Sequence, residues 1–186
     1  MEILLILFGA VIGFLSSIGT TIANDFLSRK GRVKIYYKIV FSKFAEGKTW
    51  GFHKESSGEI FEVPLWIELQ NTSNSVRVTR DLLIMLFRNG EKIAEMMQMT
   101  NTNKNEQWYG DKGAYSFVLQ PRSISKYDLH FLIKRGEMVG NEEFDEIRLR
   151  YFDEKDKEHV FTVGKIEQCW VIGDLPREKG WKLAKE

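Results

Sequence analysis

The sequence predicts an all-β domain, a single immunoglobulin-like antiparallel β-sandwich, behind one N-terminal transmembrane helix. Three observations lead to this prediction: an uncharged apolar run at the N-terminus, a two-residue hydrophobic period after it, and frequent turn signals. Short strands separated by turns every 8 to 12 residues or so are typical of sandwiches. A small β-barrel is the alternative architecture.

The N-terminal run is long enough to cross a bilayer. Residues 3–23 carry no charge, and a helix of that length spans a hydrocarbon core of about 30 Å. A cleaved signal peptide is one alternative, but it needs a positive n-region, and this chain begins Met1-Glu2. A soluble core helix is the other, but residues 4–14 show no polar stripe. We therefore expect a membrane anchor.

The orientation of the anchor follows from the charge of its flanks. Basic residues follow the run at Arg29, Lys30, Arg32, Lys34 and Lys38. By the positive-inside rule, the N-terminus lies outside and the domain lies in the cytoplasm. These cations can also lie on anionic lipid headgroups; alternatively, they act only as a topology signal.

One face of the predicted helix is made of small residues: Gly9, Gly13, Ser16 and Thr20. Small residues at this spacing let two transmembrane helices pack closely. They predict self-association and hence a homo-oligomer, although such residues are also common in spans as incidental composition.

After Arg29 the hydrophobic period changes to two. Apolar and polar residues alternate in residues 33–41, 61–69, 127–133 and 147–151, which predicts strands with one buried face. Residues 82–87, "LLIMLF", are apolar on both faces, as in a central strand, and "YSFVL" at residues 115–119 is a further strand.

Turn signals separate these strands. Asn89-Gly90 predicts a tight hairpin because both residues tolerate a positive φ. "NTSNS" at residues 71–75 and "DEKDKE" at residues 153–158 predict two further turns. We expect residues 1–28 to be the anchor and basic exit, residues 29–165 the sandwich, and residues 166–186 a final strand (166–172) and a frayed tail.

The layout of the chain resembles a known group of proteins. The stretches "IELQNTSNSVRVTRDLLIMLFRNGEKI", "LQPRSISKYDLHF" and "IRLRYFDEKDKEHVF" follow an N-terminal span with a basic exit. This is similar to small N-terminally membrane-anchored β-sandwich proteins of Gram-positive bacteria and their prophages. The resemblance implies an architecture but no activity and no site residues.

Candidate residues for catalysis or metal binding are few. His53, His130 and His159 lack the spacing of metal ligands, and His130 is expected on the solvent face of its strand. Cys169 cannot form an internal disulfide because it is the only cysteine, and we expect it to pack as a small hydrophobic residue beside Trp170.

The acidic residues Asp153, Glu154 and Asp156 form a solvated turn more readily than a calcium site, because Lys155 and Lys157 interleave them. The net charge of +1 gives no reason to expect a nucleic-acid partner. We expect no enzyme activity, no cofactor and no metal.

Aromatic residues in polar, glycine-containing connections are the clearest candidates for binding. Trp50 and Phe52 lie in one connection, and Trp108 and Tyr109 in another. Exposed aromatic residues are good contact anchors; the alternative is that they fold back over the ends of the sandwich.

These observations favour a membrane-anchored cytosolic module that binds a protein or a small ligand. One alternative is an effector in antiphage defence or prophage exclusion that perturbs the membrane by oligomerising through its helix. The other is an extracellular envelope module, which requires the basic flank to be translocated against the charge rule.

Overall fold

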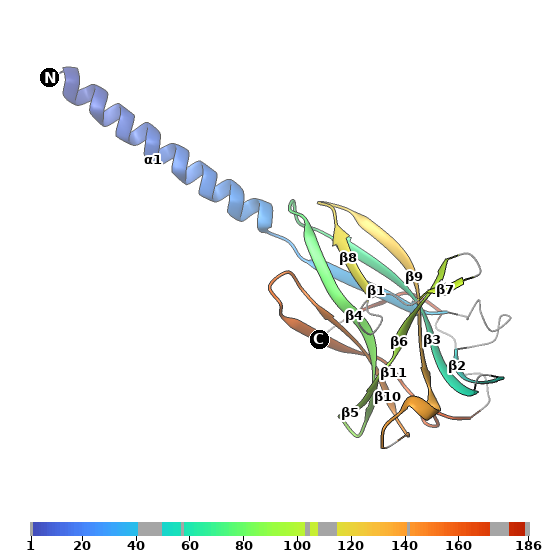
Figure 1. Cartoon of the computed structure of the whole chain (residues 1–186). Helices are drawn as coiled ribbons and strands as arrows, with labels where there is room; N and C mark the ends of the chain where they lie inside the picture. Colours follow the sequence, from blue (N-terminus) through green and yellow to red (C-terminus); the bar gives the residue numbers. More distant parts are fainter. Residues whose placement is uncertain are drawn as a thin grey trace.

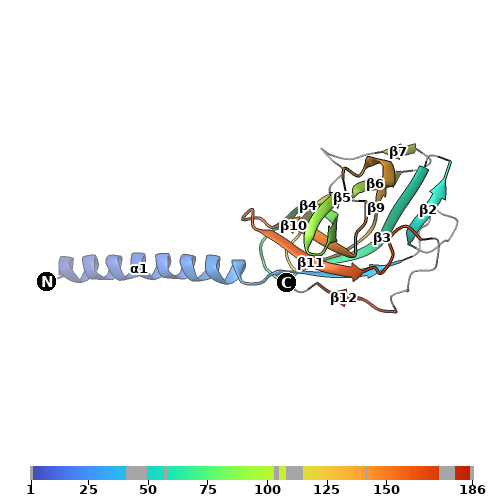
Figure 2. The same ribbon diagram turned by 90° about the horizontal axis from the view of Figure 1, so that it is seen from below.

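The computed structural model describes residues 2–40, 50–56, 58–102, 105–107, 115–140, 142–171 and 179–184. Among these residues the one α-helix is α1 (Glu2–Arg29), which extends from one end of a β-sandwich with none of the described strands packed along it (Figures 1 and 2). Its segment Ile6–Ser28 is long and apolar enough to cross a membrane, with mean hydropathy 1.9, and none of it is buried against the domain. The helix is therefore not a core helix of the sandwich. A signal sequence near the N-terminus meets the same criteria of length and hydropathy.

The strands among the described residues follow the helix in this order: β1 (Val33–Ile39), β2 (Gly51–Glu55), β3 (Gly58–Asn71), β4 (Arg77–Arg88), β5 (Glu91–Glu95), β6 (Met97–Thr102), β7 (Asn105–Gln107), β8 (Tyr115–Leu119), β9 (Ile124–Lys134), β10 (Glu146–Phe152), β11 (Glu158–Lys165) and β12 (Lys182–Leu183). A short 3₁₀ turn, η1 (Arg135–Glu137), follows β9.

These strands form two antiparallel sheets that do not close into a barrel. The larger sheet has the order β12-β1-β3-β9-β6-β7, and β2 pairs with β3 beyond the end of β1. The smaller sheet has the order β11-β10-β4-β5, and β8 pairs with the first half of β4. The prediction of a sandwich is confirmed, and the alternative of a small barrel is wrong.

The predicted turns connect strands as expected. Asn89 and Gly90 have φ of 51° and 85° and join β4 to β5, as the hairpin signal indicated. Residues 153–157 join β10 to β11. The β3–β4 turn, the β8–β9 connection and the β10–β11 turn lie at the end of the sandwich nearest α1 (Figure 1). We call this the proximal end and the opposite one the distal end.

The core lies between the two sheets. It is built from the alternating apolar residues of β3 and β9 on one side and of β4 and β10 on the other. All of Leu82 to Phe87 is buried, which confirms the prediction of a central strand. Arginines of β10 cover the outer face of β4. The Arg148 guanidinium lies 4.0 Å from the centre of the Phe87 ring, so the Arg148 side chain shields the apolar outer face of β4 from water.

The C-terminal segment differs from the prediction. Residues 166–171 form no strand, and residue 172 lies outside the described residues. Instead, the Ile166 N–H donates to the Asp145 carbonyl over 2.8 Å, and Ile166 and Cys169 pack into the core. The expected core position of Cys169 is confirmed. The last strand is β12, which pairs with Tyr36 and Tyr37 of β1; alternation cannot reveal so short a strand.

Candidate functional site at the helix–domain junction

The junction between α1 and the domain is held by hydrogen bonds to the backbone and the Thr72 side chain of the β3–β4 turn. The Arg32 N–H donates to Thr72 Oγ1 over 2.9 Å, and the Thr72 N–H donates to the Arg32 carbonyl over 3.1 Å. The Asn74 N–H reaches the Ser28 carbonyl, in the last turn of the helix, over 3.0 Å. These bonds fasten the end of the helix to the sandwich.

The Asn71 side chain holds the β3–β4 turn together through several hydrogen bonds. It is buried. The amide donates to the Ser75 carbonyl over 2.8 Å and to the Gln120 carbonyl over 2.9 Å, and the Asn71 Oδ1 accepts from the Ser73 N–H over 2.9 Å. The motif "NTSNS" is therefore a turn, as predicted, and it is also tied to the neighbouring β8–β9 connection.

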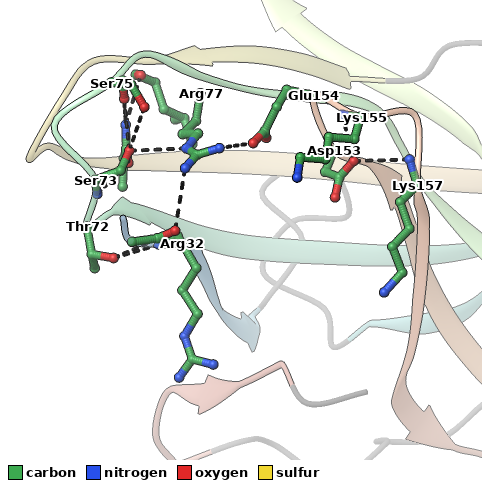
Figure 3. A network of polar contacts seen from close by, with 12 residues as sticks. Arg32, Thr72, Ser73, Ser75, Arg77, Asp153, Glu154, Lys155 and Lys157 are labelled. Atoms are coloured by element: carbon green, nitrogen blue, oxygen red, sulfur yellow. Dashed lines mark hydrogen bonds and ion pairs between the residues drawn. The ribbon is translucent and has the colours of Figure 1, made fainter. Parts of the chain in front are cut away.

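Arg77 connects three segments at the proximal end (Figure 3). Its Nε donates to Ser73 Oγ over 3.1 Å, its Nη2 lies 3.5 Å from the Gly31 carbonyl, and its Nη1 pairs with Glu154. The Arg77 side chain is only 14% exposed. The helix exit, the β3–β4 turn and the β10–β11 turn thus meet at one guanidinium.

Gly31 is required by the close approach of the chain at this point. Its φ is +130°, and an added Cβ would lie 2.7 Å from the Ser73 Cα. Only glycine adopts this conformation without strain. The close contact with the β3–β4 turn therefore requires a glycine at position 31, between α1 and β1.

The β10–β11 turn is stabilised by Asp153. The Asp153 carboxylate accepts from the N–H groups of Lys155 and Lys157 over 2.8 and 3.0 Å and lies 3.0 Å from His159 Nε2. Burial favours the neutral carboxyl, but these hydrogen bonds outweigh it and lower the pKa of Asp153.

The neighbouring carboxylates have other partners, because Glu154 pairs with Arg77 and Asp156 pairs with Arg80. The three acidic groups thus point to different partners, and the predicted turn between β10 and β11 is confirmed.

A groove runs from the junction along β1. It consists of two adjoining hollows of about 330 and 500 Å³ that share Arg32, Val33, Tyr151 and His159. The hollow nearer the helix is also lined by Gly31, Arg77 and the β10–β11 turn, and the other by Ile35, Phe161, Leu183 and Ala184. The His159 ring stacks on Tyr151 with 4.8 Å between centres. We call this feature the junction groove.

The predicted basic residues divide between the junction and the strand. Lys30 and Arg32 are exposed at the helix exit, and Arg32 and Lys34 line the junction groove. Lys38 lies about 20 Å farther along β1 than Arg32, at about 3.3 Å per residue, so it is not part of the exit. Arg29 is the last residue of α1, and its side chain lies outside the described residues.

The small-residue face of α1 is uncovered in the described structure. An added Cβ at Gly9 or Gly13 would meet nothing within 4 Å. The Thr20 hydroxyl donates to the Ser16 carbonyl over 2.8 Å, which satisfies this polar group within its own helix. Close packing of a second helix on this face stays a prediction.

The aromatic residues of the first connection, Trp50 and Phe52, for which a binding role was expected, pack against other aromatic side chains. Trp50 is only 5% exposed and packs edge-on against Phe61. Phe52 is half-buried and packs edge-on against Trp170, with ring centres 5.8 Å apart. Together with Phe144 these residues form a cluster that closes the distal end of the core. We call it the distal aromatic cluster.

The expectation that Trp50 is an exposed anchor is therefore wrong, and the alternative of aromatic residues folded over the end of the sandwich describes it. Trp108 and Tyr109 lie outside the described residues, and their binding role stays a prediction.

A second polar cluster lies on the outer face of the larger sheet. Glu62 of β3 lies 3.2 Å from His130 Nδ1 and 3.7 Å from His53 Nε2, and His130 Nε2 lies 3.4 Å from Asp128. His53, Glu62 and His130 are each at most 9% exposed. The prediction that His130 is a surface residue is wrong, because alternation identifies the outer face but not whether that face is covered.

Sequence reasoning missed this cluster because its members come from three strands whose order the sequence does not reveal. Within the part of the chain that the structure describes, no three histidine, cysteine or acidic residues are arranged to hold a metal ion. The cluster is a buried group of polar side chains in which Glu62 and His130 Nδ1 share a hydrogen bond of 3.2 Å.

Comparison with known proteins identifies a family for this chain. The family model described as the YopI Ig-like domain matches residues 31–163, which run from the junction almost to the end of β11. No curated protein and no solved structure matches the chain.

Proposed function

The chain belongs to the YopI Ig-like domain family, and on this premise we propose that it is a single-pass membrane protein whose Ig-like domain binds a partner on the cytoplasmic side. A domain of this family suggests a non-catalytic module. The basic residues after α1 support the cytoplasmic orientation.

The junction is the observation that carries this proposal. A domain that only needed a tether could follow a flexible linker, yet here the Arg32–Thr72 bonds and the Arg77 contacts fasten it to the helix. The proximal end then faces the bilayer, and the distal end is presented away from it. A domain held in a defined orientation to the helix is suited to binding a partner at the membrane.

Fractionation combined with protease protection tests the proposal. We expect the full chain in the membrane fraction, with the domain digested only after the cells are opened. A reporter fused after Glu186 should be active in the cytoplasm. A soluble protein, or a reporter active only outside, would contradict the proposal; the second result would establish the extracellular envelope module.

Self-association of α1 is the basis of the second candidate function, an effector that perturbs the membrane. It is supported by the small-residue face, which the described domain leaves open. Overexpression should then arrest growth, and Gly13→Ile should relieve the arrest, whereas Ala10→Ile, about a quarter turn away, should not. Equal toxicity of the two variants, or a harmless wild type, would contradict this candidate.

A further inference from the structure

We propose that the junction groove binds the headgroup and upper acyl chain of an anionic phospholipid. The proposal rests on the membrane anchoring proposed above. The position, the charges and the shape of the groove each favour such a ligand.

The position of the groove places its mouth in the headgroup layer. The apolar segment Ile6–Ser28 has 23 residues, about 34 Å of helix at 1.5 Å per residue, which matches a hydrocarbon core of about 30 Å. Ser28 then lies at the edge of the hydrocarbon. Gly31 and Arg32, which line the groove, follow within the polar layer that adds about 5 to 8 Å on each side.

The charges around the groove favour an anion. Its acidic side chains already have partners: Glu154 pairs with Arg77, and Asp153 with His159 and two backbone N–H groups. By contrast, the side chains of Arg32, Lys34 and Lys155 form no ion pair within the described residues. Cations therefore remain available on both walls of the groove: Arg32 at the helix exit and Lys155 in the β10–β11 turn.

The shape of the groove distinguishes a lipid from a free phosphate ion. Beyond the charged mouth its floor is apolar and aromatic: Ile35, Tyr151, Phe161, Leu183 and Ala184. The hollow of about 500 Å³ is within the range of sites for organic ligands. An inorganic anion leaves this floor exposed to water, whereas the upper part of an acyl chain, drawn out of the bilayer past the mouth, covers the apolar surface of the floor.

Native mass spectrometry of the full chain in mild detergent tests the proposal. Phosphatidylglycerol and phosphatidylcholine with the same acyl chains are added in equal amounts. The wild type should retain phosphatidylglycerol preferentially. Arg32→Gln combined with Lys155→Gln should lower that occupancy about tenfold or more, since a cation near the lipid surface contributes about 1 kcal/mol. The matched control, Lys54→Gln with Lys165→Gln, removes the same charge at exposed distal positions and should leave the occupancy unchanged.

Ala184→Trp separates binding in the groove from general attraction to charge. It fills the apolar floor and leaves every cation in place, so it should lower lipid retention severalfold. Circular dichroism melts of each variant verify that the domain is folded.

Equal retention of the two lipids would refute the proposal. So would an equal loss in the control pair, full retention in Ala184→Trp, or displacement of the lipid by an equal concentration of inorganic phosphate. Fractionation reports on the membrane anchor, and lipid selectivity reports on the groove, so the two proposals fail separately.

Discussion

Trp50 provides the sharpest test of the packing at the distal end. Its side chain is 5% exposed and contacts Phe61 at the centre of the distal aromatic cluster. Truncation to alanine removes about 150 to 200 Å² of buried apolar surface. At about 25 cal/mol per Å², this costs about 4 to 5 kcal/mol, in line with the 3 to 5 kcal/mol or so typical of buried aromatic residues.

The expected loss is measurable by thermal unfolding. For a domain of this size about 1 kcal/mol corresponds to roughly 2 to 4 °C, so Trp50→Ala should lower the Tm by about 10 °C or more. The assay is circular dichroism in the strand region, on the full chain in detergent. Trp181→Ala is the matched control, because Trp181 is 39% exposed and should cost about 1 kcal/mol or less. A Trp50→Ala variant as stable as the control would refute the core position of this residue.

Three further predictions concern the polar networks. Gly31→Ala should destabilise the domain by about 1 to 3 kcal/mol in chemical denaturation, because the φ of Gly31 is +130° and an added Cβ would lie 2.7 Å from the Ser73 Cα. Gly58→Ala is the control for backbone strain without a clash: Gly58 has φ +125° and nothing within 4 Å of an added Cβ, so this variant should cost less. Because the pKa of Asp153 is held below its ordinary 3.8, its contribution to stability is complete above that value and is lost as the pH falls through the lowered pKa. Melts from about pH 7 to about pH 3 should therefore show an acid loss below about pH 4 that Asp153→Asn reduces, and identical profiles would contradict this. Glu62→Leu should cost about 1 to 3 kcal/mol, since it removes the buried hydrogen bond between Glu62 and His130 Nδ1. An unchanged denaturation midpoint would show that this hydrogen bond contributes nothing.

Local patterns were enough to predict much of the fold. Alternation in β1, β3, β9 and β10 depends only on a strand having one buried face, and residues 82–87 are apolar on both faces wherever the strand lies. The Asn89-Gly90 hairpin is determined by the φ values that these two residues tolerate. The apolar run that became α1 is likewise visible in composition alone.

The sites depended on contacts between distant residues. Arg77 meets Glu154 only because β4 pairs with β10, and Glu62 meets His130 only because β3 pairs with β9. Alternation of apolar and polar residues predicts which residues share a face of a strand. It does not predict which strand is the neighbour in the sheet or what covers the outer face.

The same reason explains the error at Trp50, which lies in a polar stretch of sequence. Its burial is decided by packing against Phe61 of β3, which in turn contacts Trp170 at the distal end. The sequence by itself determined the strands, the hairpin and the apolar helix, because local backbone preference and side-chain alternation act over a few residues. The tertiary structure alone decided the junction, its groove and the buried polar cluster, because each joins residues that only strand pairing brings together.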